Sequence, residues 1–418
     1  MSAAVSAQRA GHHVTLFEAA RTLGGRARSL PVTLPSGHTL DLDNGQHILI
    51  GAYRATLGLM QSVGVDPTQV LHPMRLALRT PDGQGLALPA LPSPLDALAG
   101  ILSARGWSWQ DRGSLLSAVL RWRGAGFRCG AQDTVADLCR SLTPRVVQGL
   151  IEPLCVSALN TPLSTASGQM FLRVLQDALL GKGWGHWGAS WLLLPRAPLG
   201  ALLPDAATAW LARQGAVVRT GHRVSLLVQS PHGWLVDGDA FDQVVLAVAS
   251  WDAVRLLEDN AVTAGTWMVS ASSLTHESIA TVYATGGGRL ASPMLALPSG
   301  PQAPAQFVFD RAQLGGPQGL LAFVASACRG DRESIEAAVM GQARALGWRE
   351  VQALRTVIER RATFACTPAL ARPRMAIAPG LWAAGDWIEG PYPATLEGAV
   401  LSGQRVAAAL SAARRTAH

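Results

Sequence analysis

Residues 380–403 read GLWAAGDWIEGPYPATLEGAVLSG and decide the fold. The first part of this stretch predicts a buried strand that closes on Gly385 and Asp386. The small residues after Pro393 predict a helix that runs to about Arg414. A strand end, an acid and the free N–H groups of a helix start together favour a bound anion or cofactor.

The amino end of the chain supplies a matching half-site. Ser2 to Arg9 predicts a helix, Gly11 a helix stop, and His13 to Glu18 a short apolar strand that ends in an acid. In a dinucleotide-binding βαβ unit this order follows a glycine-rich turn, and the acid binds the ribose roughly 20 residues after that turn. Only 17 residues precede Glu18, so the turn and its strand would fall ahead of residue 1. We expect an incomplete unit, through either a late start codon or a genuine loss.

Two polar turns follow Glu18. Gly24 and Gly25 let the backbone approach a ligand closely, and Arg26 offers planar donors suited to a pyrophosphate. The second turn, residues 43–47, leads into a short apolar run. Both turns are therefore candidate parts of a nucleotide site.

The middle of the chain alternates between helical and extended patterns. Apolar periodicity predicts helices over 133–142, 145–159, 168–180, 206–214 and 332–346. Strands are predicted over 217–227 and 233–236, as a hairpin or meander, over 241–248 before a helix at Trp251, and across a β-rich region at 270–330.

The composition indicates a folded protein with a large core, because apolar residues make up 49% and charged residues 15%. The formal charge of +7 is almost all arginine, since Lys182 is the only lysine. The arginines are scattered, which fits a GC-rich genome better than nucleic-acid binding, and we expect no nucleic-acid partner. An attraction to anionic membrane surfaces stays open.

The cysteines and apolar segments bear on the compartment. Five cysteines without a CxxC pair predict neither a disulfide framework nor a zinc site, so no metal is expected and a reducing cytoplasm fits best. The most apolar stretch, 189–212, is interrupted by prolines and charges and fails as a bilayer span. No signal peptide opens the chain, so we expect a cytoplasmic protein that is soluble or peripheral on the inner face of the membrane.

Residues 181–191 combine glycine with three tryptophans. Such a segment can form a mobile lid or a membrane-contact loop, where tryptophan is favoured. The simpler alternative, which we favour, is a surface loop that packs its tryptophans inward.

An ordered set of motifs now resembles a known family, the FAD-dependent amine oxidase and phytoene desaturase superfamily, and most closely its hydroxysqualene dehydroxylase branch. Individually each motif is weak, but the set covers nearly the whole chain in order. The motifs are Glu18, Gly24-Gly25-Arg26, residues 43–47 (DNGQH), 152–155 (EPLC), 158–162 (ALNTP), 192–196 (LLLPR), 362–364 (ATF) with Pro368, and the ending from Gly385-Asp386 to Ser402-Gly403.

The resemblance implies an α/β fold. It predicts a Rossmann-like FAD-binding domain, incomplete at its amino terminus, assembled from 1–55, 196–255 and 355–418. An α+β substrate domain would take 56–195 and 256–354.

The resemblance also implies roles for individual residues in binding FAD. Glu18 would bind the adenosine ribose, Gly24, Gly25 and Arg26 would line the pyrophosphate, and the Val224 backbone would contact adenine. Gly385 and Asp386 would bind the ribitol or its phosphate, with Thr395 and Leu396 under the isoalloxazine.

The chemistry implied by the resemblance is the reduction of hydroxysqualene to squalene, with water released and FAD oxidised. The hydroxyl needs a proton to leave, and the hydride comes from the flavin. His47 is our first candidate proton donor, because it follows the turn expected near the flavin and titrates near neutrality. Asp43 is a weaker candidate, and water is a third.

Two other functions stay open. A carotenoid-type desaturase or isomerase would keep FAD but change the reaction, and products from hydroxysqualene and phytoene would separate the two. A flavin-free isoprenoid-binding protein would follow from a genuine amino-terminal loss. Expected partners are a long-chain isoprenoid and other enzymes of squalene and hopanoid synthesis.

Overall fold

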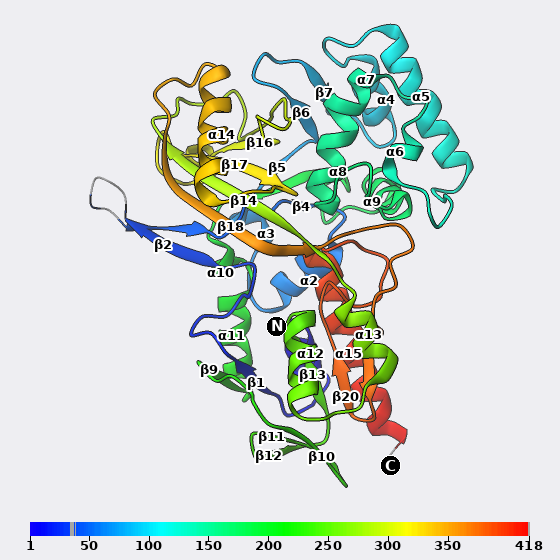
Figure 1. Cartoon of the computed structure of the whole chain (residues 1–418), viewed down its shortest axis with the longest axis vertical. Helices are drawn as coiled ribbons and strands as arrows, with labels where there is room; N and C mark the ends of the chain where they lie inside the picture. Colours follow the sequence, from blue (N-terminus) through cyan, green and yellow to red (C-terminus); the bar gives the residue numbers. More distant parts are fainter. Residues whose placement is uncertain (34–36, 38, 417–418) are drawn as a thin grey trace.

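The fold is mixed α/β, as predicted, and has two halves stacked along its long axis (Figure 1). The computed structural model describes residues 1–33, 37 and 39–416. One half holds both chain ends, and the other holds a five-stranded sheet with a group of helices beside it.

The half with the chain ends contains two short parallel pairings. β1 lies beside β9, and β13 lies beside β20, which also pairs antiparallel with β19. A separate antiparallel sheet has the order β10-β11-β12. The bounds are α1 (Ser2–Arg9), β1 (Thr15–Glu18), α10 (Leu199–Leu202), α11 (Pro204–Arg213), β9 (Val217–Thr220), β10 (Leu227–Ser230), β11 (Gly233–Val236), β12 (Asp239–Phe241), β13 (Val244–Leu246), α12 (Ser250–Asp259), α13 (Gly265–Ser272), β19 (Ala376–Ala378), β20 (Leu381–Ala383) and α15 (Leu396–Thr416).

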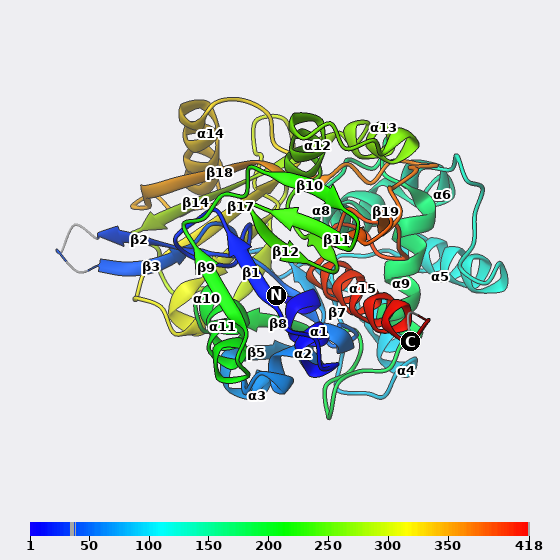
Figure 2. The same ribbon diagram turned by 90° about the horizontal axis from the view of Figure 1, so that it is seen from below.

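The first and last helices of the chain pack against each other (Figure 2). The Ser2 hydroxyl donates a hydrogen bond to the Val400 carbonyl at 2.7 Å. Gly403 makes this close approach possible, because a Cβ at that position would lie 2.6 Å from the Ala3 nitrogen. The two ends of the sequence are therefore held together by direct backbone contact.

Replacing Gly403 by alanine tests this contact. The added methyl group has no room against α1, so we expect the free energy of unfolding to fall by about 1–3 kcal/mol, as in other overpacked sites. Gly341, in a helix where a Cβ would meet nothing within 4 Å, is the matched control. Gly341→Ala should leave stability unchanged or raise it by up to about 1 kcal/mol in urea titrations.

The other half is built on the sheet β15-β16-β17-β14-β18, in which the long strands β14 and β18 pair antiparallel. The residues of β15, β16 and β17 are all buried, as are residues 280–284 of β14, whereas most residues of the edge strand β18 are partly or fully exposed. Helix α14 packs on one face of this sheet. The bounds are β14 (His276–Thr285), β15 (Met294–Ala296), β16 (Phe307–Asp310), η2 (Arg311–Leu314), β17 (Leu321–Ser326), α14 (Arg332–Ala345) and β18 (Gln352–Phe364).

Smaller elements connect the halves and complete the helical group. The connecting strands include β4-β8-β5, which carries the apolar motif at 192–195. The bounds are β2 (Ser29–Thr33), β3 (Thr39–Asp43), β4 (Leu49–Ile50), α2 (Arg54–Ser62), α3 (Pro67–Val70), β5 (Leu71–Met74), β6 (Ala77–Arg79), β7 (Gly85–Ala87), α4 (Leu95–Leu102), α5 (Trp109–Gly124), α6 (Val135–Leu138), α7 (Pro144–Val146), η1 (Val147–Ile151), α8 (Glu152–Leu159), α9 (Gly168–Leu180) and β8 (Leu192–Pro195).

Several predicted elements are confirmed and others are wrong in extent. The helices at 168–180 and 332–346 and the β-rich region 270–330 are confirmed. The helix predicted over 133–142 covers only Val135–Leu138. The helix predicted over 145–159 contains a π-helical turn just before Pro153, whose missing N–H interrupts the regular ladder.

The predicted strand 217–227 is also wrong in part. It ends at Thr220 because Gly221 turns the backbone at φ 68°. Its partner is β1, in parallel register, whereas the hairpin partner of 233–236 is Leu227–Ser230. Similarly, the strand predicted over 241–248 covers only Val244–Leu246.

The division into two domains remains a prediction. β18 runs across the boundary placed at residue 355 and pairs with β14 along most of its length. Residues 355–364 therefore contribute to the five-stranded sheet before the chain returns to the half with α15.

The tryptophan-rich segment packs inward, in agreement with the alternative that we favoured. Trp187 is 3% exposed, and Trp184 and Trp191 pack on the same core cluster. The Arg75 guanidinium lies 4.8 Å from the centre of the Trp191 ring. Trp187 is therefore buried, whereas Trp184 and Trp191 are partly buried against the same cluster.

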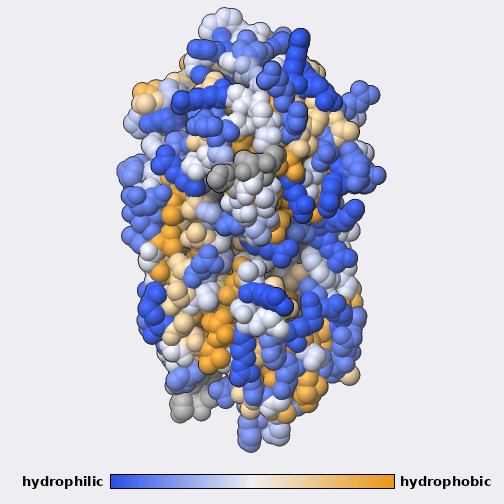
Figure 3. Space-filling model, turned by 90° about the vertical axis from the view of Figure 1, so that its left-hand side faces the viewer, coloured by the Kyte–Doolittle hydropathy of each residue, from blue (hydrophilic) through white to orange (hydrophobic). Residues whose placement is uncertain are grey.

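The face shown in Figure 3 is mainly polar, with scattered apolar residues in both its upper and its lower half. None of the helices within the described ranges is both long and apolar enough to cross a bilayer.

Candidate active site

A cavity of about 2110 Å³ runs through the half that holds the chain ends and reaches the five-stranded sheet. Both Glu18 and Asp386 line it, although they lie at opposite ends of the sequence. The predicted cofactor-binding residues all line this one cavity: Glu18, Gly24, Gly25, Arg26, Val224, Gly385, Asp386, Thr395 and Leu396.

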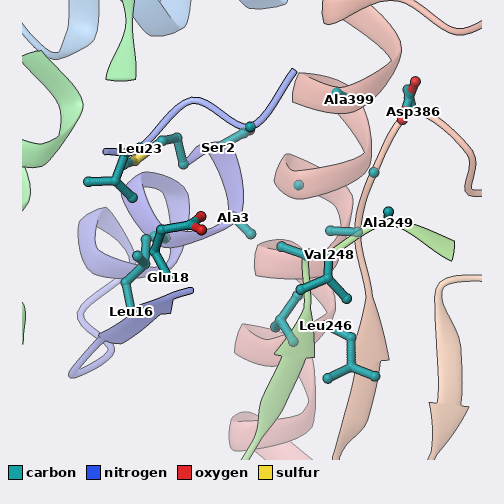
Figure 4. A pocket seen from close by; sticks show the side chains of 18 of the residues that line it. Ser2, Ala3, Leu16, Glu18, Leu23, Leu246, Val248, Ala249, Asp386 and Ala399 are labelled. Carbon is teal, nitrogen blue, oxygen red and sulfur yellow. The ribbon is translucent and has the colours of Figure 1, made fainter. Parts of the chain in front are cut away.

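Glu18 stands at the end of β1, where the chain turns away from the strand. One of its carboxylate oxygens accepts a hydrogen bond from the Ala20 N–H at 2.8 Å. Figure 4 shows the carboxylate at the cavity, with Asp386 on the other side beyond α15. A carboxylate in this place is suited to accept hydrogen bonds from a ribose.

Arg26 and Asp386 form an ion pair in the cavity wall. The Arg26 Nη2 to Asp386 Oδ1 distance is 2.6 Å, and Arg26 Nη1 donates to the Ala362 carbonyl at 2.5 Å. The neighbouring Asp386 carboxylate raises the pKa of Arg26, so this cation stays charged. The ion pair thus joins the turn that contains Arg26 to the strand end at Asp386, and the sequence predicts both at one site.

The start of α15 is held by its own side chains. The Thr395 hydroxyl accepts the Gly398 N–H at 3.1 Å, and the Ser402 hydroxyl accepts the Gly385 N–H at 3.1 Å. These bonds tie the end of β20 to the first turns of the helix. The helix start therefore faces the cavity in a fixed position, as an anion site requires.

Glu397 is a residue whose role we missed. Its buried carboxylate accepts hydrogen bonds from the Ala55 N–H, the Thr56 N–H and the Thr56 hydroxyl at 2.6–2.8 Å. These donors lie in the first turn of α2, so Glu397 joins the starts of α2 and α15. Local sequence gives no sign of this contact.

His47 lines the cavity in a state that does not suit a proton donor. Its Nδ1 lies 3.2 Å from the Gly45 carbonyl, which can only accept, so Nδ1 carries the proton. Burial lowers the pKa of His47, which leaves the ring neutral at neutral pH and Nε2 without a proton. The geometry thus favours His47 as an acceptor that orients a water or hydroxyl.

The lowered pKa of His47 predicts a direction for pH-dependent stability. The unfolded chain binds this proton more readily, so stability is retained above the ordinary value of 6.5 and is lost as pH falls below it. We expect the wild type to lose more free energy of unfolding than His47→Gln between about pH 7.5 and about pH 5.5. Substitution of the exposed His186 by glutamine is the control, and equal losses in all three proteins would contradict the account.

Asp43 does not lie among the residues that line the cavity in the described part of the chain. It is buried and accepts hydrogen bonds from the Leu199 N–H at 2.9 Å and the Ser29 hydroxyl at 3.0 Å. Burial raises its pKa. These contacts join β3 to β2 and to α10, so they give Asp43 a structural place and argue against the predicted catalytic one.

Two of the motifs that carry the family resemblance contact the five-stranded sheet beside the cavity. Gln46 donates to the Tyr283 hydroxyl at 2.8 Å and accepts from Arg311 at 3.1 Å. Asn160, in the left-handed region at φ 47°, donates to the Thr363 hydroxyl at 2.9 Å. The DNGQH, ALNTP and ATF motifs therefore converge, which the sequence order alone did not reveal.

The residues present fit a dinucleotide. An elongated cavity carries a carboxylate suited to a ribose at one side, a glycine-arginine turn along its length, and a helix start beside Asp386. Apolar residues such as Ile48 and Leu49 line the same cavity. This is the donor and acceptor set that FAD needs along its length.

A family comparison decides the class of protein. The model of the flavin-containing amine oxidoreductases matches residues 1–411. The chain belongs to this family. Its cofactor is therefore FAD, and the enzyme is an oxidoreductase.

Two curated relatives are similar over nearly their whole length. The hydroxysqualene dehydroxylase of Sinorhizobium fredii is 27% identical over 97% of this chain and 94% of its own. The hydroxysqualene dehydroxylase of Rhodopseudomonas palustris is 27% identical over 99% and 96%. Among solved structures, an oxidoreductase from Methanosarcina mazei matches with a TM-score of 0.71 at 15% identity, over 97% of this chain and 96% of that one, which bears on the fold alone.

Proposed function

We propose that this flavoprotein reduces hydroxysqualene to squalene. The allylic C–O bond breaks, a C–H bond forms at the carbon framework, and the hydroxyl leaves as water. Reduced FAD would supply one hydride, which carries both electrons, and a proton leaves with the hydroxyl as water. The observation that carries this proposal is the near full-length similarity to two hydroxysqualene dehydroxylases.

The cavity lining supports a large apolar substrate. The apolar side chains of Ile48, Leu49, Met60, Ala158 and Ile279 line the same cavity as His47. Such a lining excludes water and holds a hydrocarbon chain by burial of its apolar surface. A dry site also strengthens the interactions that a leaving hydroxyl makes.

In this proposal His47 orients the reacting group, and water supplies the proton. The unprotonated Nε2 of His47 accepts a hydrogen bond from a water or from the substrate hydroxyl, and so orients it. The proton that leaves with the hydroxyl comes through water. The Gly45 carbonyl holds the ring in the required tautomer.

The flavin-free isoprenoid-binding protein is the less favoured alternative, because the chain belongs to a flavin-containing family. A carotenoid-type desaturase remains the second candidate for comparison. Desaturation consumes oxidised flavin, whereas dehydroxylation consumes reduced flavin, so the two demand opposite starting states.

The direct experiment supplies the purified protein with FAD and hydroxysqualene in the absence of oxygen. With the flavin reduced by dithionite, we expect squalene to form in step with flavin oxidation, measured by mass spectrometry and absorbance. With oxidised flavin, no squalene should form. Conversion of phytoene by the oxidised protein, with hydroxysqualene untouched, would replace this proposal by the desaturase.

We also propose that the protein takes its substrate from a membrane surface through the exposed face of α4. Leu95, Leu98 and Leu102 lie on one side of this helix and are 44–55% exposed. Leu180 lies nearby, because Ser93 donates to the Leu179 carbonyl at 2.8 Å, and is 50% exposed. A cluster of exposed leucines is suited to the interface of a lipid bilayer.

Vesicle sedimentation tests this face. The double substitution Leu95→Glu and Leu98→Glu should lower the fraction bound to anionic vesicles by at least about tenfold, because each buried leucine contributes about 1.5–3 kcal/mol. Val269, which is 70% exposed on α13 in the other half, gives the control Val269→Glu. Equal binding of all three proteins would rule out the α4 face.

A further inference from the structure

The side chain of Gln46 is anchored by two buried residues of the half that contains the five-stranded sheet. Its Oε1 accepts a hydrogen bond from the Arg311 guanidinium at 3.1 Å, and its Nε2 donates to the Tyr283 hydroxyl at 2.8 Å. Tyr283 is fully buried, and Arg311 is 9% exposed. Gln46 itself lines the cavity, next to His47. The amide group is therefore held in one place at the cavity wall.

These contacts allow only one orientation of the Gln46 amide. A guanidinium can only donate hydrogen bonds, so the amide oxygen must face Arg311. The Asp43 carbonyl can only accept, so the Tyr283 hydroxyl donates to it at 2.8 Å, and the hydroxyl oxygen is left to accept from Gln46. Burial raises the pKa of Tyr283, so this hydroxyl keeps its proton. Both neighbours thus require the NH₂ group of Gln46 to face Tyr283.

One N–H of Gln46 is not used by these contacts. A side-chain amide carries two N–H groups, and the bond to Tyr283 uses one of them. Among the residues that the structure describes, Nε2 has no second hydrogen-bond partner. Because Gln46 lines the cavity, the second N–H can donate to a ligand there. The cavity wall therefore carries a hydrogen-bond donor whose position is fixed.

Arg311 strengthens this donor. None of the ion pairs among the described residues includes Arg311, although burial of an unpaired cation is costly. Its guanidinium donates instead to the Gln46 oxygen. A donor on the oxygen side polarises the amide and makes its N–H groups better donors. The buried cation therefore acts at the cavity wall through Gln46.

His47 supplies the complementary group. Its Nδ1 carries the proton that faces the Gly45 carbonyl, so its Nε2 is an acceptor. An alcohol oxygen accepts one hydrogen bond and donates another, whereas a hydrocarbon does neither. The cavity thus offers a donor and an acceptor on consecutive residues, together with apolar lining such as Ile48 and Ile279. This combination matches an alcohol carried on a hydrocarbon chain.

We infer that Gln46 is the residue that selects the hydroxyl group of the substrate. Its free N–H donates to the hydroxyl oxygen, while that hydroxyl donates to the His47 Nε2 or to a water held there. The donor stabilises the oxygen as the C–O bond breaks, and the amide transfers no proton.

The same donor distinguishes the substrate from the product. A hydrocarbon such as squalene leaves the Gln46 N–H without a partner in a dry site, which is unfavourable, so the product binds more weakly than the alcohol and leaves. The inference rests on the proposed function, because it takes an alcohol as the substrate.

Ligand binding to the oxidised flavoprotein tests the inference without turnover. Hydroxysqualene is compared with squalene, and farnesol with farnesene, through the change in flavin absorbance under anaerobic conditions. We expect the wild type to bind each alcohol about tenfold more tightly than its hydrocarbon, as one buried hydrogen bond allows. In Gln46→Glu the ratio should fall to about 1, because a carboxylate accepts from Arg311 but has no N–H for the alcohol.

Three further variants separate selection of the hydroxyl from support of the turn. Gln46→Met has neither an N–H nor a charge, and should lose the preference as Gln46→Glu does. Tyr283→Phe removes the buried hydroxyl but leaves the Gln46 amide, so it should retain the preference for the alcohol. The exposed Gln110 gives the control Gln110→Glu, which introduces the same charge away from the cavity and should behave as the wild type.

Three results would overturn the inference. The first is an undiminished preference for the alcohol in both Gln46 variants. The second is an equal loss of the preference in Tyr283→Phe, which would show that Gln46 only supports the turn. The third is a wild type that binds the two members of both pairs alike, or binds neither. The proposed reaction fails separately: if the reduced enzyme forms no squalene while the preference is intact, the alcohol site stands and the reaction does not.

Discussion

Asp386→Asn should lower the affinity for FAD by about 10- to 100-fold, the range expected when hydrogen bonds of a charged group are lost. The Asp386 carboxylate accepts from Arg26 at 2.6 Å and is itself 8% exposed. The introduced asparagine carries an NH₂ donor where Asp386 has an acceptor oxygen. If this NH₂ group faces the Arg26 guanidinium, donor meets donor, and Arg26 loses the hydrogen bond that fixes it in the cavity wall. Flavin fluorescence titration measures the effect.

Asp239→Asn is the matched control for this substitution. Asp239 also pairs with an arginine, Arg219, at 2.7 Å, but both side chains are exposed by more than two-fifths. Surface ion pairs of this kind contribute about 0–1 kcal/mol to the stability of the fold. Neither Asp239 nor Arg219 is among the residues that line the cavity. Unchanged or tighter FAD binding by Asp386→Asn would show that the carboxylate is not part of the cofactor site.

Glu397→Ala should destabilise the protein by about 3 kcal/mol, because it leaves several buried donors without an acceptor. The substitution removes the acceptor of the Ala55 N–H, the Thr56 N–H and the Thr56 hydroxyl. The contact spans the chain, so its loss separates the start of α2 from α15. Urea unfolding followed by circular dichroism gives the change in free energy.

An exposed glutamate in the first turn of a helix provides the comparison. Glu333 stands in this position in α14, and Glu333→Ala should cost less than about 1 kcal/mol. If Glu397→Ala unfolds at the same urea concentration as the wild type, the two helix starts are not held by this carboxylate.

The sequence predicted those parts of the fold that depend on residues close together in the chain. The helix at 168–180 follows from apolar periodicity, and in the structure the Ser167 side chain caps its first turn. The acid at the end of β1 and the Gly385-Asp386 strand end were recognisable because strand, turn and helix follow one another in sequence. These local patterns located both ends of the cavity.

The parts that could not be predicted depend on partners far away in the chain. Glu397 contacts a residue 342 positions earlier, and no periodicity encodes that contact. Nothing in the four residues 217–220 (VVRT) distinguishes a hairpin strand from a parallel one, and only the packed structure selects β1 as the partner. Asp43 was a candidate because it lies close to His47 in sequence, but its Oδ1 accepts hydrogen bonds from both Leu199 and Ser29.

The central claim is that one FAD lies between Glu18 at its adenosine end and Asp386 at its ribitol end. Comparing the affinities of FAD and FMN in two variants tests it most directly, because FMN lacks the adenosine part. Glu18→Gln should weaken FAD binding by about tenfold and leave FMN binding unchanged, whereas Asp386→Asn should weaken both. If Glu18→Gln affects FAD and FMN equally, or neither of them, Glu18 does not hold the adenosine end and the account is contradicted.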